Sequence, residues 1–337
     1  MKNNFLGRNF INANDWSKKD LELALKLAVF LKKKYSKESF PALLHKTLYL
    51  LFFFFSTRTR TSFEAAMDHL GGNSHELIPG QLQIHHGDTA KEIGNILSSY
   101  GHGIAIRQCD WGVGNKYINE VAKHSSVPVF NMQCDVYHPF QAMADLMTIR
   151  EEFGINLKGK KIVMSWAYAK TYAKPVSVPQ SFLLLLSLFG ADLVLAHPKK
   201  FELMPDIISE VKNNIKKHGG NFLVTNNMED AAEGAHVVYA KNWGALCTTN
   251  NQKKLADLAF ENKDWICDEK LMKKASKKAI YMHCLPAERG VEVTDAVIDG
   301  LQSVVYRQAE NRLHVQKAIL LLTMVRHLDM KKFSITK

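Results

Sequence analysis

The feature that most constrains the fold is an alternation of short apolar runs with amphipathic segments along the chain. The apolar runs fit buried strands and lie at 47–55, 103–108, 127–132, 161–167, 191–196, 221–225, 236–241 and 279–283. Segments with helical spacing separate them, at 17–33, 60–70, 89–100, 117–124, 139–153, 178–189, 205–217 and 229–234. Apolar strands that alternate with helices are typical of parallel sheets covered on both faces. The predicted fold class is therefore α/β, with doubly wound parallel sheets.

A short polar connector divides this pattern into two blocks. Gly154 and Gly159 bracket it, and the 337 residues of the chain suffice for two domains of ordinary size. We therefore expect one domain over residues 1–153 and a second over residues 154–307. A last helix is expected over 308–330.

Composition favours a cytoplasmic enzyme. No apolar run approaches the ~18 residues that would span a bilayer, and no signal-peptide core follows Met1. The 5 cysteines include no C-x-x-C pair. This pattern favours reduced thiols over a disulfide framework or a zinc ribbon. We expect no membrane partner.

The formal charge of +11 raises the alternative of a nucleic-acid-binding protein. The lysines, however, fall in scattered pairs and triplets such as Lys32–Lys34 and Lys277–Lys278, without interleaved aromatics. Most lie where a helix would face solvent. We therefore expect no nucleic-acid partner. A positive field would still attract a phosphate-bearing substrate.

The segment Ser56-Thr57-Arg58-Thr59-Arg60 lies between the first apolar run and a predicted helix. A helix begins with unpaired backbone N–H groups and the positive end of its dipole, which favour a phosphate. The two arginines add planar, bidentate phosphate ligands. By itself, the segment is equally compatible with a solvated basic turn or a kinase target.

Three further segments give this motif a context. They are His138-Pro139-Phe140-Gln141, His283-Cys284-Leu285-Pro286, and Arg312 within residues 309–314. In this order and spacing the four segments resemble the aspartate/ornithine carbamoyltransferase family, over about residues 4–327. The resemblance implies that the last helix packs back on the first domain.

The resemblance implies carbamoyl transfer to an amine, with carbamoyl phosphate and a small amino acid as substrates. The amine attacks the carbonyl and phosphate leaves, so no metal and no cofactor is expected. The residues implied to bind carbamoyl phosphate are Ser56, Thr57, Arg58, Thr59, Arg60, Gln83, Arg107, His138, Gln141, Cys284, Leu285 and Arg312. Those implied to act in catalysis are Arg107, His138, Gln141, Cys284 and Arg312.

The segment 82–89 resembles a loop that, in this family, reaches a neighbouring subunit's carbamoyl phosphate. Gln83 stands where ornithine enzymes often carry the reaching glutamine. The resemblance thus implies a homotrimer with shared active sites. The alternative is that segment 82–89 is a surface loop with no role in an active site.

The amine substrate is less defined. Ornithine enzymes usually carry D-x-W-x-S-M-G, whereas this chain has Lys241, Trp243 and Ala245 in the matching run. A cation there would repel a free α-ammonium and favour a carboxylate or an acylated nitrogen. The residues expected to bind the amine are Lys241, Trp243, Cys284 and Leu285.

The loop 165–180, with its W-A-Y, K-P and V-P-Q elements, resembles the knotted branch of the family. That branch holds N-acetylornithine and N-succinylornithine enzymes and an unassigned group. The resemblance therefore implies a knot in the second domain, N-acetylornithine or a related N-acylated diamino acid as substrate, and a place in arginine biosynthesis. Plain ornithine and another small amine are the alternatives.

Overall fold

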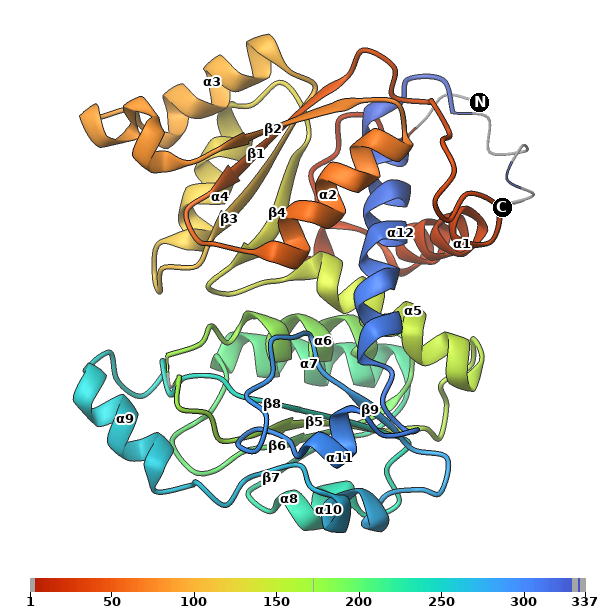
Figure 1. Ribbon diagram of the computed structural model, residues 1–337, viewed down its shortest axis with the longest axis vertical. Coiled ribbons are helices and arrows are strands. Elements are labelled where there is room, and N and C mark those ends of the chain that lie inside the picture. The colour runs from red at the N-terminus through yellow and green to blue at the C-terminus, as the bar shows by residue number, and fades with distance from the viewer. Residues whose placement is uncertain (1–3, 172, 329–332, 334–337) are drawn as a thin grey trace. The chain divides into compact units, whose positions relative to one another are not determined.

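The computed structural model describes residues 4–171, 173–328 and 333, and its chain divides into two compact units (Figure 1). Unit 1 comprises the residues up to Met147 and those from Glu310 onward, and unit 2 comprises Thr148–Ala309. The division falls inside two helices, α5 (Pro139–Phe153) and α12 (Val305–Met324). The boundaries expected from the sequence, 153/154 and 307/308, lie a few residues away.

Unit 1 is built on a parallel sheet with the strand order β2-β1-β3-β4. The strands are β1 (Thr47–Phe52), β2 (Asn73–Leu77), β3 (Gly103–Gln108) and β4 (Val129–Cys134). The helices are α1 (Lys18–Lys34), α2 (Thr57–His69), α3 (Ala90–Tyr100) and α4 (Gly114–His124). Short 3₁₀ turns lie at η1 (Ala13–Asp15), η2 (Pro79–Gln81) and η3 (Gln83–His86). Helix α4 packs against β3 and β4, and α2 packs against β2.

Unit 2 is built on a parallel sheet with the strand order β7-β6-β5-β8-β9. The strands are β5 (Lys161–Trp166), β6 (Asp192–Ala196), β7 (Phe222–Thr225), β8 (Val237–Lys241) and β9 (Ile280–Met282). The helices are α6 (Ser177–Ser187), α7 (Pro205–His218), α8 (Met228–Ala232), α9 (Gln252–Phe260), α10 (Glu269–Lys274) and α11 (Asp295–Ile298). In Figure 1, α6 and α7 lie on one face of this sheet, and α8, α10 and α11 lie on the other.

Burial explains why the central strands read as continuous apolar runs. Every residue of β4, β8 and α6 is buried. A strand that is covered on both faces has no polar side, so its sequence does not alternate. Val163 and Val194 face the cluster formed with α8, α10 and α11. The predicted α/β class with doubly wound parallel sheets is confirmed. The knot stays a prediction.

The first strand is shorter than predicted. The apolar run 47–55 predicts a strand over its whole length, but β1 ends at Phe52. Phe54 keeps 38% of its surface exposed, and Phe55 is fully exposed at 101%. The residues between Phe52 and Ser56 therefore form a turn that connects the strand to α2. Hydrophobicity alone gave no sign of this turn.

Candidate active site

The strand orders locate a candidate site in each unit. Strand β1 lies between β2 and β3, and β5 lies between β6 and β8, so successive connections leave in opposite directions at these points. In open parallel sheets, ligands bind at the carboxyl ends of the strands where the order reverses. The segment 56–60 directly follows β1, and Arg107 is near the end of β3. Lys241 is the last residue of β8.

In unit 1, the segment 56–60 forms the start of α2. Ser56 is the N-cap residue, and its side chain accepts a hydrogen bond from the Thr59 backbone N–H (3.3 Å). The first turn of the helix carries no acidic side chain. The N-terminus of this 13-residue helix therefore offers backbone N–H groups and a positive dipole to an anion.

Arg312 reaches this helix from the far end of the chain. Its Nη2 atom donates to Thr59 Oγ1 at 2.7 Å, and both side chains are buried. The contact joins α12 to the first turn of α2, across 253 positions of sequence. Two of the residues predicted to bind carbamoyl phosphate are thus in direct contact.

Arg107 is held by a residue that the sequence did not identify as part of the site. A nitrogen of its guanidinium donates to the side-chain oxygen of Gln133, on the neighbouring strand β4. The register between β3 and β4 shifts between Ile106 and Arg107, which pairs Arg107 with Gln133. The hydrophobic pattern of the sequence does not predict this shift in the pairing of β3 with β4.

His138 and Gln141 lie at the start of α5, and both are buried. Gln141 Nε2 donates to Asp145 Oδ1 at 2.8 Å, one turn further along the helix. A carboxylate only accepts hydrogen bonds, so Asp145 fixes which way the amide of Gln141 points. Among the described residues, Gln141 Oε1 has no hydrogen-bond partner. It is a buried acceptor that a ligand N–H would satisfy.

Two predicted residues have other contacts. Arg60 donates through Nε to Glu64 (3.1 Å) and forms an ion pair through Nη1 with Glu76 (2.9 Å). Its guanidinium therefore already has two anionic partners, and it lines a cavity of about 610 Å³ next to η2. Gln83 is exposed on η3, where its Oε1 lies 2.7 Å from His86 Nδ1.

In unit 2, the residues predicted to bind the amine differ in accessibility. Lys241 is buried, and its Nζ donates to the Asn242 carbonyl at 2.6 Å. Cys284 is half-buried after β9, and Leu285 adopts φ +56°, a strained conformation for a residue that is not glycine. Trp243 is fully buried, and its indole N–H donates to the Phe201 carbonyl (2.9 Å). The structure thus places Trp243 in the core.

The sequence analysis missed a buried carboxylate beside these residues. Glu292 has 0% exposure, and it accepts hydrogen bonds from the backbone N–H groups of Asn242 (2.8 Å) and Glu288 (2.7 Å). Lys174 Nζ lies 3.2 Å from its Oε2, and His283 Nε2 lies 3.5 Å from its Oε1. A carboxylate thus lies in the chain segment that packs against Asn242, the residue after Lys241.

These contacts set the charges of the group. Burial would raise the pKa of Glu292, but the contact with His283 and the charges of Lys174 and Lys241 hold that pKa well below its ordinary value. Burial lowers the pKa of His283 and that of Lys241. Glu292 is thus an anion near neutral pH, and both of its oxygens are already engaged by groups of its own chain.

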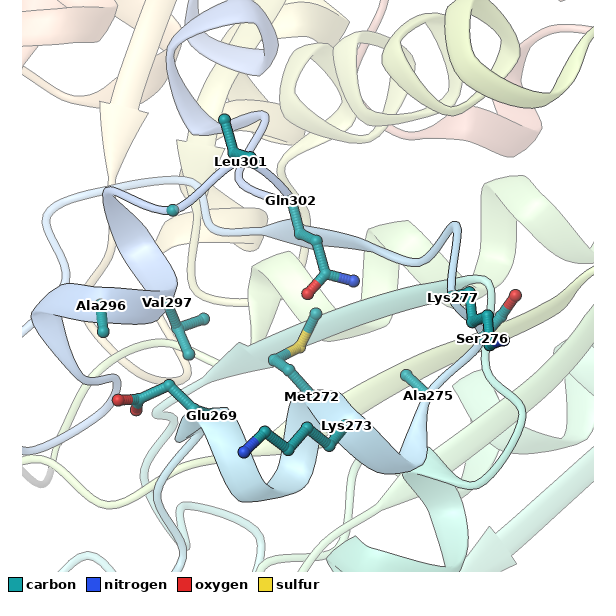
Figure 2. Close-up of a pocket in the computed structure, with 11 residues that line it drawn as sticks. Glu269, Met272, Lys273, Ala275, Ser276, Lys277, Ala296, Val297, Leu301 and Gln302 are labelled. Carbon is teal, nitrogen blue, oxygen red and sulfur yellow. The ribbon is translucent and has the colours of Figure 1, made fainter.

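Unit 2 also contains a cavity of about 530 Å³ beside α10 and α11 (Figure 2). Met272, Val297 and Gln302 line it, and Gln302 donates to the Ala279 carbonyl just before β9. The cavity therefore lies at the amino end of β9, whereas Cys284 follows its carboxyl end. It does not belong to the amine-binding residues.

Among the described residues, no group of three or more His, Cys, Asp or Glu side chains is placed to hold a metal ion. Over the same residues, no helix has both the length and the apolar character needed to cross a bilayer.

Comparisons with known proteins agree with this arrangement. The carbamoyl-phosphate-binding domain model of the aspartate/ornithine carbamoyltransferases matches residues 8–151, and the Asp/Orn-binding domain model matches residues 158–323. A putative carbamoyltransferase of Escherichia coli K12, YgeW, is 39% identical over 303 residues, covering 79% of this chain and 76% of its own. The catabolic ornithine carbamoyltransferase of Thermoplasma acidophilum is 37% identical over 302 residues (90% and 94%).

Solved structures give the same result. Acetylornithine transcarbamylase complexed with acetylcitrulline superposes with a TM-score of 0.87 at 33% identity, covering 94% of this chain and 99% of the other. Ornithine carbamoyltransferase from Pyrococcus furiosus gives 0.85 at 35% identity, covering 95% and 98%. The chain therefore belongs to the aspartate/ornithine carbamoyltransferase family, and it is a carbamoyltransferase.

Proposed function

We propose that this enzyme transfers the carbamoyl group of carbamoyl phosphate to the side-chain amine of an N-acylated diamino acid, with N-acetylornithine as the first candidate. The observation that carries this choice is Lys241, a buried ammonium group at the carboxyl end of β8. A free α-ammonium beside it would meet a like charge, whereas an acylated nitrogen carries none. Glu292 would not neutralise that α-ammonium, because groups of the chain itself already contact both of its carboxylate oxygens.

Unit 1 would bind carbamoyl phosphate. The N-terminus of α2, with Arg58, takes the phosphate, and Arg312 is held beside it by Thr59. Arg107 and His138 stabilise the negative charge that develops on the carbonyl oxygen, as preorganised donors do. Gln141 Oε1 accepts from the carbamoyl NH₂ group, since Asp145 turns that oxygen away from itself.

In the reaction, the neutral amine attacks the carbamoyl carbon and a C–N bond forms. The tetrahedral oxyanion collapses, the C–O bond to phosphate breaks, and phosphate leaves with the bonding electrons. The proton lost by the amine leaves with phosphate or solvent. Rate enhancement then comes from holding both reactants in orientation and from stabilising the oxyanion.

The test is a screen of amines with carbamoyl phosphate, read as carbamoylated product. The panel contains N-acetylornithine, N-succinylornithine, ornithine, putrescine and 2,3-diaminopropionate. We expect the highest kcat/KM with an N-acylated ornithine. Efficient turnover of ornithine with N-acetylornithine inert would contradict the proposal.

That result would establish the second candidate, a plain ornithine carbamoyltransferase. The similarity to the ornithine enzymes of T. acidophilum and P. furiosus supports this alternative. Identity does not separate the candidates, because the acetylornithine structures match at 33% and the P. furiosus enzyme at 35%.

A homotrimer with shared active sites is the second part of the proposal, and it rests on the exposed position of Gln83 on η3. We infer that Gln83 of one subunit reaches the carbamoyl phosphate of the next. Mixing Gln83→Ala subunits with Arg58→Ala subunits should then restore activity, because some sites receive both wild-type residues. Full activity in a species that light scattering shows to be a monomer would exclude a shared site.

The free thiols support a cytoplasmic location.

A further inference from the structure

Lys174 connects the loop after β5 to the run that carries Lys241. Its backbone carbonyl accepts a hydrogen bond from the backbone N–H of Gly244 at 2.9 Å. Gly244 belongs to the run 241–245, which corresponds to the D-x-W-x-S-M-G segment of ornithine enzymes. Lys174 is therefore anchored beside residues expected to bind the amine, at the carboxyl edge of the sheet, where ligands bind in such folds.

The ammonium group of Lys174 lies between two carboxylates. Its Nζ atom is 3.2 Å from Glu292 Oε2 and 3.8 Å from Glu288 Oε1. Both acids follow Cys284 and Leu285 in the segment after β9. The side chain of Lys174 keeps 19% of its surface exposed and that of Glu288 keeps 26%, whereas Glu292 is fully buried. The accessible side of this group therefore consists of Lys174 and Glu288.

Glu288 is an anion that the chain itself already engages. It accepts the backbone N–H groups of Lys170 (2.7 Å) and Thr171 (3.1 Å), in the loop after β5. Burial would raise the pKa of Glu288, but these hydrogen bonds and the charge of Lys174 hold that pKa below its ordinary value. Glu288 is thus ionised near neutral pH, and its ammonium partner is Lys174.

Neutralisation by Lys174 affects which α-nitrogen this edge of the sheet favours. A carboxylate without a cation would attract an α-ammonium, the charged group of ornithine that N-acetylornithine lacks. With Lys174 in place, an α-ammonium beside Glu288 meets a like charge and has to displace an existing ion pair. An acylated nitrogen carries no charge, so it incurs neither cost.

We propose that Lys174 is a specificity-determining residue: its ammonium group occupies the carboxylates of Glu288 and Glu292, and it thereby disfavours amine substrates with a free α-ammonium. This inference rests on the proposed function, and it adds a second determinant of the amine to Lys241. Lys174 acts through charge at the α-nitrogen and does not contact the reacting atoms.

The first experiment measures binding of two inert analogues that differ at the α-nitrogen alone. Norvaline is ornithine without its terminal amine, and N-acetylnorvaline is its acylated counterpart, so both lack the amine that is carbamoylated. Calorimetric titration in the presence of carbamoyl phosphate gives both Kd values, and the wild type should bind N-acetylnorvaline more tightly. In Lys174→Met, the ratio of the norvaline Kd to the N-acetylnorvaline Kd should fall about tenfold, because Glu288 then lacks its cation.

Two control variants separate charge from structure. Lys174→Arg keeps the charge, so the Kd ratio should stay within about threefold of wild type. Lys274→Met removes an exposed lysine that pairs with Glu229 (2.8 Å), and it should change neither Kd. A loop that merely lost its support would weaken both analogues alike. An unchanged ratio in Lys174→Met would therefore overturn the inference.

A second variant keeps the test decisive if Lys174→Met does not fold. Glu288→Gln leaves Lys174 paired with Glu292 alone, so the accessible side of the group becomes cationic. The carboxamide oxygen of the new side chain can still accept from the backbone N–H groups of the loop. The Kd ratio should now rise, because norvaline is repelled and N-acetylnorvaline has no α-charge to repel. A ratio that falls or stays unchanged in Glu288→Gln would also overturn the inference.

The kinetic arm compares ornithine with N-acetylornithine as substrates. In Lys174→Met, kcat/KM for ornithine should rise about tenfold relative to that for N-acetylornithine, while KM for carbamoyl phosphate stays within about twofold. A shifted Kd ratio with an unchanged ratio of kcat/KM would overturn the role in substrate choice. If the wild type prefers ornithine, the proposed function fails, and the change in the Kd ratio still decides whether Lys174 opposes an α-ammonium.

Discussion

The contact between Thr59 and Arg312 allows a quantitative test of the proposed phosphate site. Thr59→Val replaces a hydroxyl with a methyl group of similar volume, so it creates no cavity in this buried position. It removes the acceptor of the 2.7 Å hydrogen bond from Arg312. A hydrogen bond to a charged group is worth about 1.5–3 kcal/mol. The free energy of unfolding should fall by about that amount.

The same change should weaken phosphate binding. If the bond serves to hold the Arg312 guanidinium beside the ligand, a loss of about 1.5–3 kcal/mol corresponds to a rise of about 10- to 150-fold in Kd. The assay is calorimetric titration of inorganic phosphate, which needs no amine substrate. Thr59→Ser keeps the hydroxyl and is the matched control, with Kd within about threefold of wild type.

Stability and binding separate the possible results. A Thr59→Val protein that is less stable but binds phosphate within twofold of the control would show that the bond only fastens α12 to α2. The assignment of Arg312 to the phosphate site would then be refuted.

Three further results are expected. Arg58→Ala should cost about 2–4 kcal/mol in transition-state stabilisation with the fold intact, measured as kcat/KM for carbamoyl phosphate beside circular dichroism; near-wild-type turnover would contradict its role. Lys241→Glu should raise KM for the amine far more than KM for carbamoyl phosphate, and an equal rise in both would count against the carboxylate contact. Glu292 has a folded-state pKa below its ordinary value of 4.5, so its stabilising contribution is present above that pH and is lost as pH falls toward the folded value. Acid unfolding should accordingly be less steep below pH 4.5 in Glu292→Gln, and identical acid limbs would contradict the sign.

The sequence predicted the buried parts of the fold well and the exposed parts poorly. Strand β3 was predicted at its observed bounds, because an apolar run in a doubly covered sheet has a strong signature. Strand β2 (Asn73–Leu77) was missed, since it is a largely polar strand at the sheet's edge with no buried residue. The apolar pattern does not predict α9, α10 and α11 for a similar reason, because these helices are short and each carries exposed residues.

For the candidate site, the sequence predicted the residues that belong to motifs and missed the residues that hold them in place. Motif residues such as Arg312 and Thr59 were predicted one by one, and the structure joins them through a contact that no local pattern encodes. Asp145 and Glu292 were missed because each acts on a neighbouring side chain. The motif around Trp243 says nothing of depth, and the structure places this ring in the core. Side chains that support others carry no sequence signal of their own.

If Gln141 accepts a hydrogen bond from the carbamoyl NH₂ group, as proposed above, its fixed amide decides which acyl phosphates the enzyme accepts. Acetyl phosphate has nearly the shape of carbamoyl phosphate, but it carries a methyl group in place of the NH₂ group. With Asp145 holding the amide, Gln141 cannot rotate to suit the methyl, and its buried oxygen would stay unsatisfied. A site built to pair with a substrate N–H rejects the analogue that lacks it by far more than shape alone allows. One carboxylate behind one amide would thereby keep the enzyme from acetylating its amine substrate in a cell that contains both acyl donors.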